Sequence, residues 1–418
     1  MPALTFEALA TFPGEADISR IVALELVVPK EGADPVLYAT TRYDGGICAW
    51  ELGPSGAAAL DETAHRRDDA PGAVPDLAVI DTPGGPALLS GGGDGGALML
   101  YPIADDGSLG APSSLGTMPA FGGDLAGTVT VQLGNGGQAV YGAITGQSGV
   151  GYLIFDSAGR LTGSGTVTAG GQVHDDRIAD MAHAVVAGQD YLFGIDMSDP
   201  GVTSWAVSGN GTLSAVDSVS AADGLWISAP TALEVVTAGG VTFLVAAAAG
   251  SGTLSVIEVG PGGALTVTDH VLDDLTSRFA SVQALATVQH DGKGYVVAGG
   301  GDDGISLFQI LPDGTLLALA HLADNAAMSL ASVSDIVAQS AGGKIEIFVS
   351  SGLETGVTML SYDPGTAGQE LSAASGGSTL TGTGQNDMLW GNAGNDRLSG
   401  AGGDDILLDG GGSDTLIG

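Results

Sequence analysis

The sequence predicts an all-β protein, a seven-bladed β-propeller followed by a short parallel β-roll. Three observations lead to this fold class. Apolar strand-like segments recur seven times at steps of 51 or 52 residues. A series of turn glycines runs through the same seven units, in phase with the strands. After residue 381 the sequence changes to a glycine-rich repeat of nine residues.

The seven long units share a central apolar segment, seen in "VLYATT", "AVYGAI" and "YVVAGG". Each segment has an apolar anchor residue, followed two positions later by a small residue. The anchors are Leu37, Leu88, Val140, Leu192, Leu244, Val296 and Phe348. The turn glycines are Gly56, Gly107, Gly159, Gly211, Gly263, Gly314 and Gly365. Two series with one period indicate a repeat protein in which every unit has the same fold.

Each unit reads as four short strands joined by hairpins. In residues 282–322, "ALATVQ" and "YVVAGG" flank the turn sequence His-Asp-Gly-Lys-Gly, and "ISLFQI" and "TLLALAHL" flank Pro-Asp-Gly. Four strands per unit, repeated seven times, are typical of a β-propeller, whose closed ring leaves no long sheet edge exposed.

The start of the chain is expected to complete the ring. The seventh unit lacks a clear fourth strand after "TMLSYDPG", whereas "PALTFEALAT" near the N-terminus resembles the fourth strands of other units. We therefore expect residues 3–11 to form the outer strand of blade seven. Matching third-strand positions hold aromatic residues that we expect to pack between blades. These residues are Trp50, Tyr101, Trp205 and Phe308.

The unit length and the recurrent Gly-x-Leu turn resemble those of the lactonase-type seven-bladed propellers, which are related to 6-phosphogluconolactonase. This likeness is architectural and covers residues 1–368. Because one superfold supports many functions, it implies little about chemistry. The predicted domains are the propeller at 1–368, a linker with a degenerate repeat at 369–380, and the roll at 381–418.

The composition limits the classes of partner. The chain has 11 Lys and Arg against 48 Asp and Glu, a formal net charge of −37. This charge repels nucleic acid and anionic membrane surfaces, and it fits a solubilising surface, a salty environment or a cation-binding protein. The one cysteine, Cys48, has no partner for a disulfide within the chain and is expected to be buried. The N-terminus lacks the regions of a cleavable signal peptide, and no apolar run is long enough to span a bilayer.

Four nine-residue units can be stacked in register at the C-terminus: "GTGQNDMLW", "GNAGNDRLS", "GAGGDDILL" and "DGGGSDTLI". Each has an aspartate at its sixth position and a leucine two residues later. The aspartates are Asp387, Asp396, Asp405 and Asp414, and the leucines are Leu389, Leu398, Leu407 and Leu416. Glycines permit turns that aim backbone carbonyls inward, and the aspartate adds a carboxylate. Because Ca²⁺ takes six to eight such oxygens, the repeat predicts calcium binding; the alternative is a flexible acidic tail.

The nonapeptides resemble the repeat-in-toxin motif, G-G-x-G-x-D-x-U-x, of secreted bacterial proteins. The resemblance implies a roll whose successive turns lie on alternate sides, with each ion between turns two repeats apart. It implies one site with Asp387 and Asp405 and another with Asp396 and Asp414, while a third, poorer site would involve Ser378. The turn glycines that it places at these sites are Gly382, Gly384, Gly391, Gly400, Gly402 and Gly411.

Two departures from the motif lie in the outer repeats. Gln385 replaces the usual glycine at the fourth position of one, and Asp409 replaces the first glycine of another. We expect both turns to depart from the ideal geometry.

The resemblance also implies export by a type I secretion apparatus, to the extracellular space or the cell surface. The single cysteine and the lack of a signal peptide agree with this route. Extracellular calcium modules bind with Kd of ~10⁻⁴–10⁻³ M, so we expect the acidic roll to fold only after leaving the calcium-poor cytosol. Gly418 is the first residue of a fifth repeat, and we therefore expect a longer chain with more repeats.

Candidate chemistry in the propeller lies at the mouth of the central channel, where the innermost strands converge. Alignment of these strands puts Glu25, His183 and Glu234 at equivalent positions. The loops before them contain Arg20, Arg177 and Arg278. Together these groups could activate a water and hold an anionic substrate, or they could be channel residues bridged by water.

Other features are weaker. The loops "GGGDGG" (91–96) and "GGGDDG" (299–304) suggest calcium, but hairpin turns also require Gly and Asp. The sequence contains no nucleophile elbow, zinc-protease, paired Cys-x-x-Cys or phosphate-loop motif. Two functions remain: a secreted, calcium-stabilised scaffold that binds an extracellular protein or glycan, and a secreted lactonase-like hydrolase acting at the channel mouth. We favour the scaffold because the sequence offers no evident nucleophile or metal triad.

Overall fold

The computed structural model describes residues 3–11, 21–41, 47–53, 56–63, 76–91, 97–116, 125–144, 147–168 and 174–418. It contains two compact units, a propeller and a C-terminal roll. The propeller unit comprises Thr5–Ser340 and Glu346–Ser361, and the other unit contains Tyr362–Gly418 together with residues 1–4 and 341–345. Both are built from strands, and two short 3-10 helices, η1 (Ala221–Asp223) and η2 (Pro261–Gly263), lie in propeller loops of the described chain.

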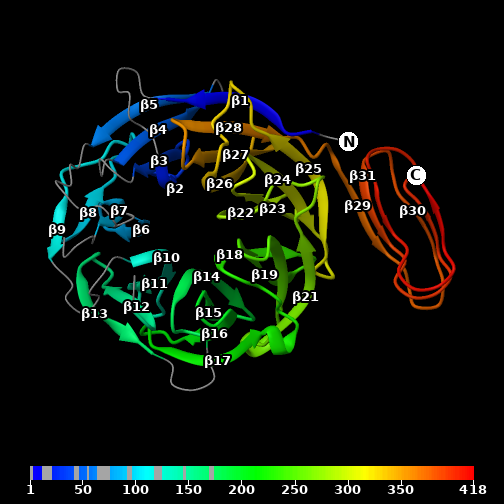
Figure 1. Cartoon of the computed structure of the whole chain (residues 1–418), viewed down its shortest axis with the longest axis horizontal. Coiled ribbons are helices and arrows are strands. Elements are labelled where there is room, and N and C mark those ends of the chain that lie inside the picture. Colours follow the sequence, from blue (N-terminus) through cyan, green and yellow to red (C-terminus); the bar gives the residue numbers. More distant parts are fainter. Residues whose placement is uncertain are drawn as a thin grey trace. The chain divides into compact units, whose positions relative to one another are not determined.

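The propeller consists of seven four-stranded sheets around a central opening (Figure 1). Written from the innermost strand outward, blade one is β2 (Ile21–Val27), β3 (Val36–Thr41), β4 (Ile47–Gly53) and β5 (Gly56–Thr63). Blade two is β6 (Leu77–Thr82), β7 (Gly85–Gly91), β8 (Leu98–Pro102) and β9 (Ser113–Gly116). Blade three is β10 (Leu125–Gln132), β11 (Gln138–Ile144), β12 (Val150–Phe155) and β13 (Leu161–Val167).

The remaining blades have the same order of strands. Blade four is β14 (Ile178–Val186), β15 (Gln189–Asp196), β16 (Gly201–Val207) and β17 (Leu213–Ser220). Blade five is β18 (Pro230–Ala238), β19 (Val241–Ala248), β20 (Thr253–Val259) and β21 (Leu265–Leu272). Blade six is β22 (Ala284–His290), β23 (Lys293–Gly299), β24 (Gly304–Ile310) and β25 (Leu316–Ala323). Blade seven is β26 (Val333–Ala341), β27 (Lys344–Ser351), β28 (Val357–Tyr362) and β1 (Thr5–Ala10).

The N-terminal strand closes the ring, as the sequence predicted. Strand β1 pairs antiparallel with β28, and Thr5 lies opposite Ser361 while Ala10 lies opposite Val357. Strand β1 therefore covers the outer edge of β28 and gives blade seven its fourth strand, from the opposite end of the chain.

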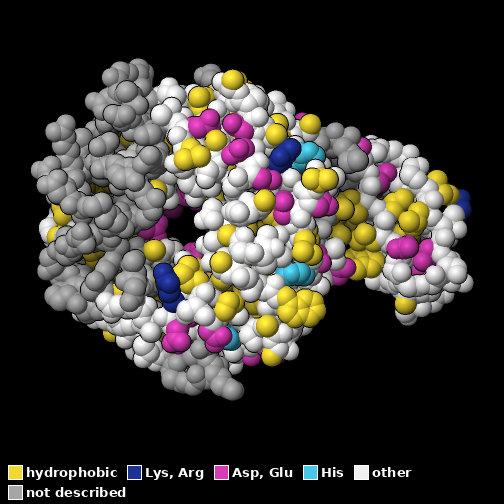
Figure 2. Space-filling view, in the orientation of Figure 1, with side chains coloured by type: hydrophobic (Ala, Val, Ile, Leu, Met, Phe, Trp, Pro, Cys, Tyr) yellow, Lys and Arg dark blue, Asp and Glu magenta, His cyan; other side chains and the backbone are white. Residues whose placement is uncertain are grey.

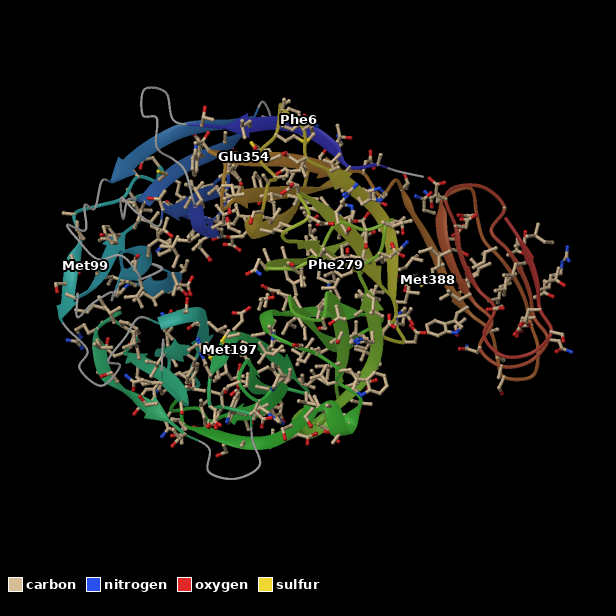
Figure 3. The ribbon with its side chains drawn as sticks, viewed as in Figure 1. Phe6, Met99, Met197, Phe279, Glu354 and Met388 are labelled. Carbon is tan, nitrogen blue, oxygen red and sulfur yellow. The ribbon has the colours of Figure 1, made fainter. Side chains whose placement is uncertain are left out.

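The predicted aromatic positions lie between blades. Trp50 of blade one packs in a buried cluster with Phe348 of blade seven. Trp205 of blade four packs in a cluster with Tyr141 of blade three. Figure 3 shows Phe279, which lies with Phe308 between blades five and six. The hydrophobic core is therefore divided into layers, each of which joins two neighbouring blades.

In blades two to six, the turn glycines contact the preceding blade, which explains why they run in phase with the anchors. Gly211 has φ +84°, and a Cβ there would lie 2.8 Å from Ile154 of blade three. The hydroxyl of Tyr141, in the same blade as Ile154, donates a hydrogen bond to the Gly211 carbonyl at 2.7 Å. The hydroxyl of Tyr38 makes the same bond to Gly107 at 2.5 Å. The left-handed turn thus needs glycine for its backbone and for its close contact.

The roll contains two parallel three-stranded sheets. One comprises β29 (Ala367–Ser372), β31 (Asn386–Trp390) and β33 (Ile406–Leu408), and the other comprises β30 (Thr379–Thr381), β32 (Arg397–Ser399) and β34 (Thr415–Ile417). Leu389 pairs with Leu407, and Leu398 pairs with Leu416, so the repeated leucines stack in register. Leu389 and Leu398 are fully buried at 0% exposure and form the core of the roll.

The roll begins earlier than the sequence predicted. Residues 369–380, expected to be a linker and a degenerate repeat, contain most of β29 and the start of β30, and Leu371 of β29 pairs with Leu389. Leu371 continues the nine-residue series by one more step, but Gln369 stands where the other repeats have aspartate. Because of this substitution, the nine-residue pattern did not reveal that β29 belongs to the roll.

Candidate functional site

The aspartates of the roll form two ladders that join residues eighteen positions apart. In one ladder, Asp405 Oδ1 accepts a hydrogen bond from the Asp387 backbone N–H at 2.9 Å. In the other, Asp414 Oδ1 accepts from the Asp396 N–H at 2.7 Å. The structure therefore brings together the same pairs of aspartates that the repeat resemblance implies. Ser378 lies eighteen residues before Asp396, at the start of the same ladder, and its N–H donates to Asp396 Oδ1 at 2.6 Å.

Asp396 has one carboxylate oxygen with nothing to bind. The residue is 3% exposed, and its Oδ2 is buried without a hydrogen-bond partner. A buried anionic oxygen that has lost its water and gained no donor is costly, and an adjacent cation removes this cost. The carboxylate is a hard oxygen donor of the kind that Ca²⁺ prefers. The residues of this turn therefore fit a calcium ion.

The glycines predicted at the metal sites fall into two groups. At Gly382 and Gly400, a Cβ would lie 2.5 Å from Asp387 Oδ2 and 2.0 Å from Asp405 Oδ2 respectively. At Gly391, a Cβ would lie 2.0 Å from the Asp409 carbonyl oxygen. The second group has room for a side chain, because no atom lies closer than 3.8 Å to a Cβ placed there. This group is Gly384, Gly402 and Gly411. The first glycine thus lies against an aspartate carboxylate in two repeats, at Gly382 and Gly400, and against a backbone carbonyl at Gly391.

Three of the four turns share an unusual backbone, with left-handed residues at the second and fourth positions. These pairs are Asn392 (φ 59°) and Gly394 (φ 123°), Ala401 (φ 79°) and Gly403 (φ 111°), and Gly410 (φ 78°) and Gly412 (φ 139°). The turn containing Gln385 lacks both left-handed residues, as expected from its departure from the motif. The turn beginning at Asp409 keeps them, contrary to our expectation, because the left-handed positions are still glycines.

Hydrogen bonds of asparagine side chains in the roll, in addition to the two aspartate ladders, were not predicted from the sequence. Asn386 Oδ1 accepts a hydrogen bond from the Asp404 N–H at 2.9 Å, and Asn395 Oδ1 accepts from the Ser413 N–H at 2.9 Å. These asparagines hold the fifth positions of successive turns in place. The dipeptide Asn-Asp, present in two consecutive repeats, was the available signal.

Side chains alone do not complete a metal site in the described part of the chain. No three carboxylate, imidazole or thiol groups are grouped there so as to bind one ion. In the roll, each ion would therefore need backbone carbonyls besides one or two aspartates, as expected for turns rich in glycine.

The central channel of the propeller is acidic. A cavity of about 530 Å³ is lined by residues from the innermost strands of the blades. Its lining includes five carboxylates and one imidazole, and no Lys or Arg among the described residues. The carboxylates are Glu25, Asp76, Asp180, Glu234 and Asp335. Figure 2 shows one end of the opening, with acidic side chains at its edge. Such a channel favours cationic or neutral ligands over anions.

Three of these carboxylates, which the sequence analysis missed, join neighbouring blades. Asp180 Oδ2 accepts a hydrogen bond from the Leu233 N–H at 2.8 Å, across the interface of blades four and five. Asp76 Oδ2 accepts from the Thr128 N–H at 2.9 Å, across blades two and three. Asp335 Oδ2 accepts a hydrogen bond from the Leu24 N–H at 2.6 Å, across blades seven and one. Asp76 and Asp180 both lie twelve residues before their anchors, which was the available signal.

Burial and mutual repulsion make these carboxyls weak acids. Burial, with the charges of nearby aspartates, raises the pKa of Glu25 and that of Glu234 to about 8. Burial likewise raises the pKa of Asp180 and that of Asp335 to about 7, although backbone N–H donors oppose the shift. Groups with such values can donate or accept protons near neutral pH.

The register of the strands corrects one alignment. Glu25 and Glu234 each lie opposite the residue that follows their blade's anchor, whereas His183 lies opposite the anchor Leu192 itself. His183 is therefore displaced by one position, although it still lines the cavity. Its Nε2 lies 2.9 Å from Asp190 Oδ1 on the next strand.

The arginines do not join this group. Arg177 and Arg278 are not among the residues that line the cavity, and Arg20 lies outside the described residues. Of the two Gly- and Asp-rich loops, residues 92–96 also lie outside them. In the other loop, Asp303 Oδ1 accepts a hydrogen bond from the Ser332 N–H at 3.1 Å, which is a structural role.

Comparison with known proteins agrees with both units. The family of RTX calcium-binding nonapeptide repeats matches residues 372–407 and 399–418, in four copies. The C-terminal segment thus carries RTX repeats, and their ligand is Ca²⁺. No curated protein matches the sequence. The described part of the chain contains no helix that is long and apolar enough to span a membrane.

Two solved structures resemble the chain over most of its length. A protein from Lactobacillus plantarum is 18% identical, with a TM-score of 0.53 over 78% of this chain and 98% of that one. The N-terminal domain of Nup159 is 10% identical, with a TM-score of 0.50 over 86% of this chain and 95% of that one. At such identities the likeness shows the fold alone.

Proposed function

We propose that this protein is exported from the cell and acts outside it as a calcium-dependent binding scaffold. In this proposal the roll folds when it binds extracellular Ca²⁺, and the propeller presents a rigid surface to an extracellular protein or glycan. The route of export is a type I secretion apparatus.

The observation that carries the proposal is the buried, unpartnered Oδ2 of Asp396. A turn with this oxygen is incomplete without a cation. Residues 371–418 contain six aspartates and one arginine, so charge repulsion opposes folding of the roll until a cation neutralises it. Ca²⁺ binding to the folded roll then supplies folding free energy where calcium is millimolar.

The residues that we propose to hold calcium are Asp396 and Asp414 on one side of the roll and Asp405 on the other, with carbonyls of the glycine turns. When bound, the ion would supply positive charge to carboxylates that otherwise repel one another. The chain's own contribution is to place these oxygens by the two ladders of backbone hydrogen bonds.

The test is a calcium titration of the full-length protein, followed by calorimetry and by hydrogen exchange of residues 371–418. We expect heat of binding and slower exchange in the roll at millimolar Ca²⁺, and neither at equal Mg²⁺. The Asp396→Asn variant should bind fewer ions, while Asp34→Asn, on the propeller surface, should match the wild type. Equal exchange in chelator and in calcium would refute calcium-driven folding. Export is tested separately, by comparing the amounts in the culture medium with and without residues 371–418.

A hydrolase acting at the channel mouth is the second candidate. The observation in its favour is that Glu25, Glu234 and His183 line one cavity, with both glutamates titrating near neutral pH. Glu234→Gln and His183→Ala should then abolish turnover of a lactone or ester while circular dichroism shows that both variants keep the fold. Unchanged turnover in both variants would exclude these residues as the catalytic groups.

A further inference from the structure

Asp387 differs from the other repeat aspartates because protein donors occupy both of its carboxylate oxygens. The Thr383 N–H donates to Asp387 Oδ2 at 2.6 Å, and the Thr383 hydroxyl lies 3.2 and 3.1 Å from Oδ1 and Oδ2. The Gln369 N–H donates to Oδ1 at 2.5 Å. Asp387 is 1% exposed, so this carboxylate is both buried and satisfied. Asp396, at the same position of the next repeat, has a buried oxygen without a partner.

The cause is the side chains at the second and fourth positions of the turn. The turns of the three later nonapeptides, which begin at Gly391, Gly400 and Asp409, are left-handed at both positions. In each of them the fourth residue is a glycine with φ above 110°. A β-branched threonine strongly disfavours left-handed φ, and φ beyond about 100° is a region for glycine alone. Thr383 and Gln385 therefore keep their turn in an ordinary conformation. In this conformation the Thr383 amide and hydroxyl both contact Asp387.

We propose that the turn at 382–387, with the strand pair β29–β31, folds without calcium and nucleates the roll; we call this unit the first rung. The amide and hydroxyl of Thr383 contact the Asp387 carboxylate in the place that an ion would take. This inference rests on the proposed calcium-driven folding and deepens it. The first parallel pairing of the roll, β29 with β31, is held by Gln369 and Asp387 without a cation. The chain enters β29 directly after β28, so this rung is the first to follow the propeller in sequence.

Two consequences follow for calcium. The site implied by Asp387 with Asp405 lacks a free oxygen from Asp387, so ions on this side of the roll depend on Asp405 and backbone carbonyls. Ordering of the later turns also starts from a rung that is already formed. Because forming the first ordered unit is the costly step in a linear repeat, a preformed rung lowers the calcium concentration needed to fold the rest.

The test uses the full-length protein in chelator and in millimolar CaCl₂. In chelator, we expect the amides of Gln369 and Thr383 to exchange at least tenfold more slowly than the amide of Asp396. Addition of calcium should slow the exchange of Asp396 and leave the other two almost unchanged. In calorimetry, Asp387→Asn should keep the wild-type number of bound ions, whereas Asp396→Asn should lose one.

A double variant tests the cause. Thr383→Gly combined with Gln385→Gly frees the turn to adopt the left-handed backbone, so it should bind one more ion and lose its protection in chelator. Thr383→Ser keeps the hydroxyl and should behave as the wild type. The inference is overturned if Gln369 and Thr383 exchange as fast as Asp396 in chelator, or if Asp387→Asn loses an ion. Absence of any calcium heat in the wild type would instead overturn calcium-driven folding itself.

Discussion

Asp335, on the innermost strand of blade seven, accepts a hydrogen bond from the backbone N–H of Leu24 on blade one, at 2.6 Å. Its other oxygen accepts from the Ile336 N–H at 2.8 Å. The two strands joined by this carboxylate are more than 300 residues apart in the chain. The ring is thus closed twice, by the shared outer strand β1 and by an inner contact at the channel.

The inner contact should contribute measurably to stability. Asp335→Ala removes the acceptor and leaves the Leu24 N–H without its partner, at a cost of about 1–3 kcal/mol. We expect the free energy of unfolding in urea to fall by this amount at pH 5, where repulsion between channel carboxylates is small. Asp34→Ala, an exposed aspartate, should change it by less than about 0.5 kcal/mol. Equal stability of the two variants would show that the contact contributes nothing.

The channel carboxylates should make the propeller less stable as pH rises. Burial raises the pKa of Glu25 and of Glu234 from 4.5 to about 8, so both bind a proton more tightly in the folded state than in the unfolded chain. Their stabilising contribution is complete below pH 4.5 and is lost as the pH passes through 8. The double variant Glu25→Gln, Glu234→Gln should therefore unfold at higher urea than the wild type at about pH 9.

The control for this pH effect replaces two exposed glutamates, Glu31→Gln and Glu51→Gln. This variant should keep the wild-type slope of stability against pH. A flat profile in the wild type between about pH 5 and pH 9 would contradict the predicted titration of the channel groups.

Removal of residues 3–11 should open the ring. The outer edge of β28 would lose its partner β1, and an unpaired edge is a site for association with other chains. We expect the truncated protein to melt at a lower temperature and to form soluble oligomers in light scattering. A synthetic peptide with residues 3–11 should restore the monomer, whereas a peptide of scrambled order should not. A monomeric truncated protein with unchanged melting would show that blade seven does not need this strand.

Periodicity made most of the fold predictable. The steps between Leu37 and Phe348 set the number of blades, and the lack of a fourth strand in the last unit pointed to β1. The same reasoning predicted the two pairs of aspartates that the roll joins, Asp387 with Asp405 and Asp396 with Asp414, because they repeat with their flanking leucines.

What periodicity missed occurs in only some of the repeats. Asp76, Asp180 and Asp335 lie in blades two, four and seven, without a regular spacing, and a β-bulge next to Asp180 shifts the local register by one residue. His183 was misplaced because its strand pairs it with the anchor Leu192, one position away from the pairing of Glu25 and Glu234. Thr383 was not recognised because its effect depends on backbone conformation, which the nine-residue spacing does not report.

The first glycine of the nonapeptide should be essential and the third should not. At Gly400 a Cβ would lie 2.0 Å from Asp405 Oδ2, whereas at Gly402 the nearest atom would be 3.8 Å away. Neither residue has a positive φ, so alanine does not strain the backbone at either position. The two variants therefore differ only in the room available for the Cβ. We expect Gly400→Ala to weaken calcium binding by at least about tenfold in calorimetry, which corresponds to about 1.4 kcal/mol, because the carboxylate must move away from its ladder. Gly402→Ala should stay within about twofold of the wild type. If both variants bound calcium equally well, the carboxylate of Asp405 would not hold the position in which it approaches an ion.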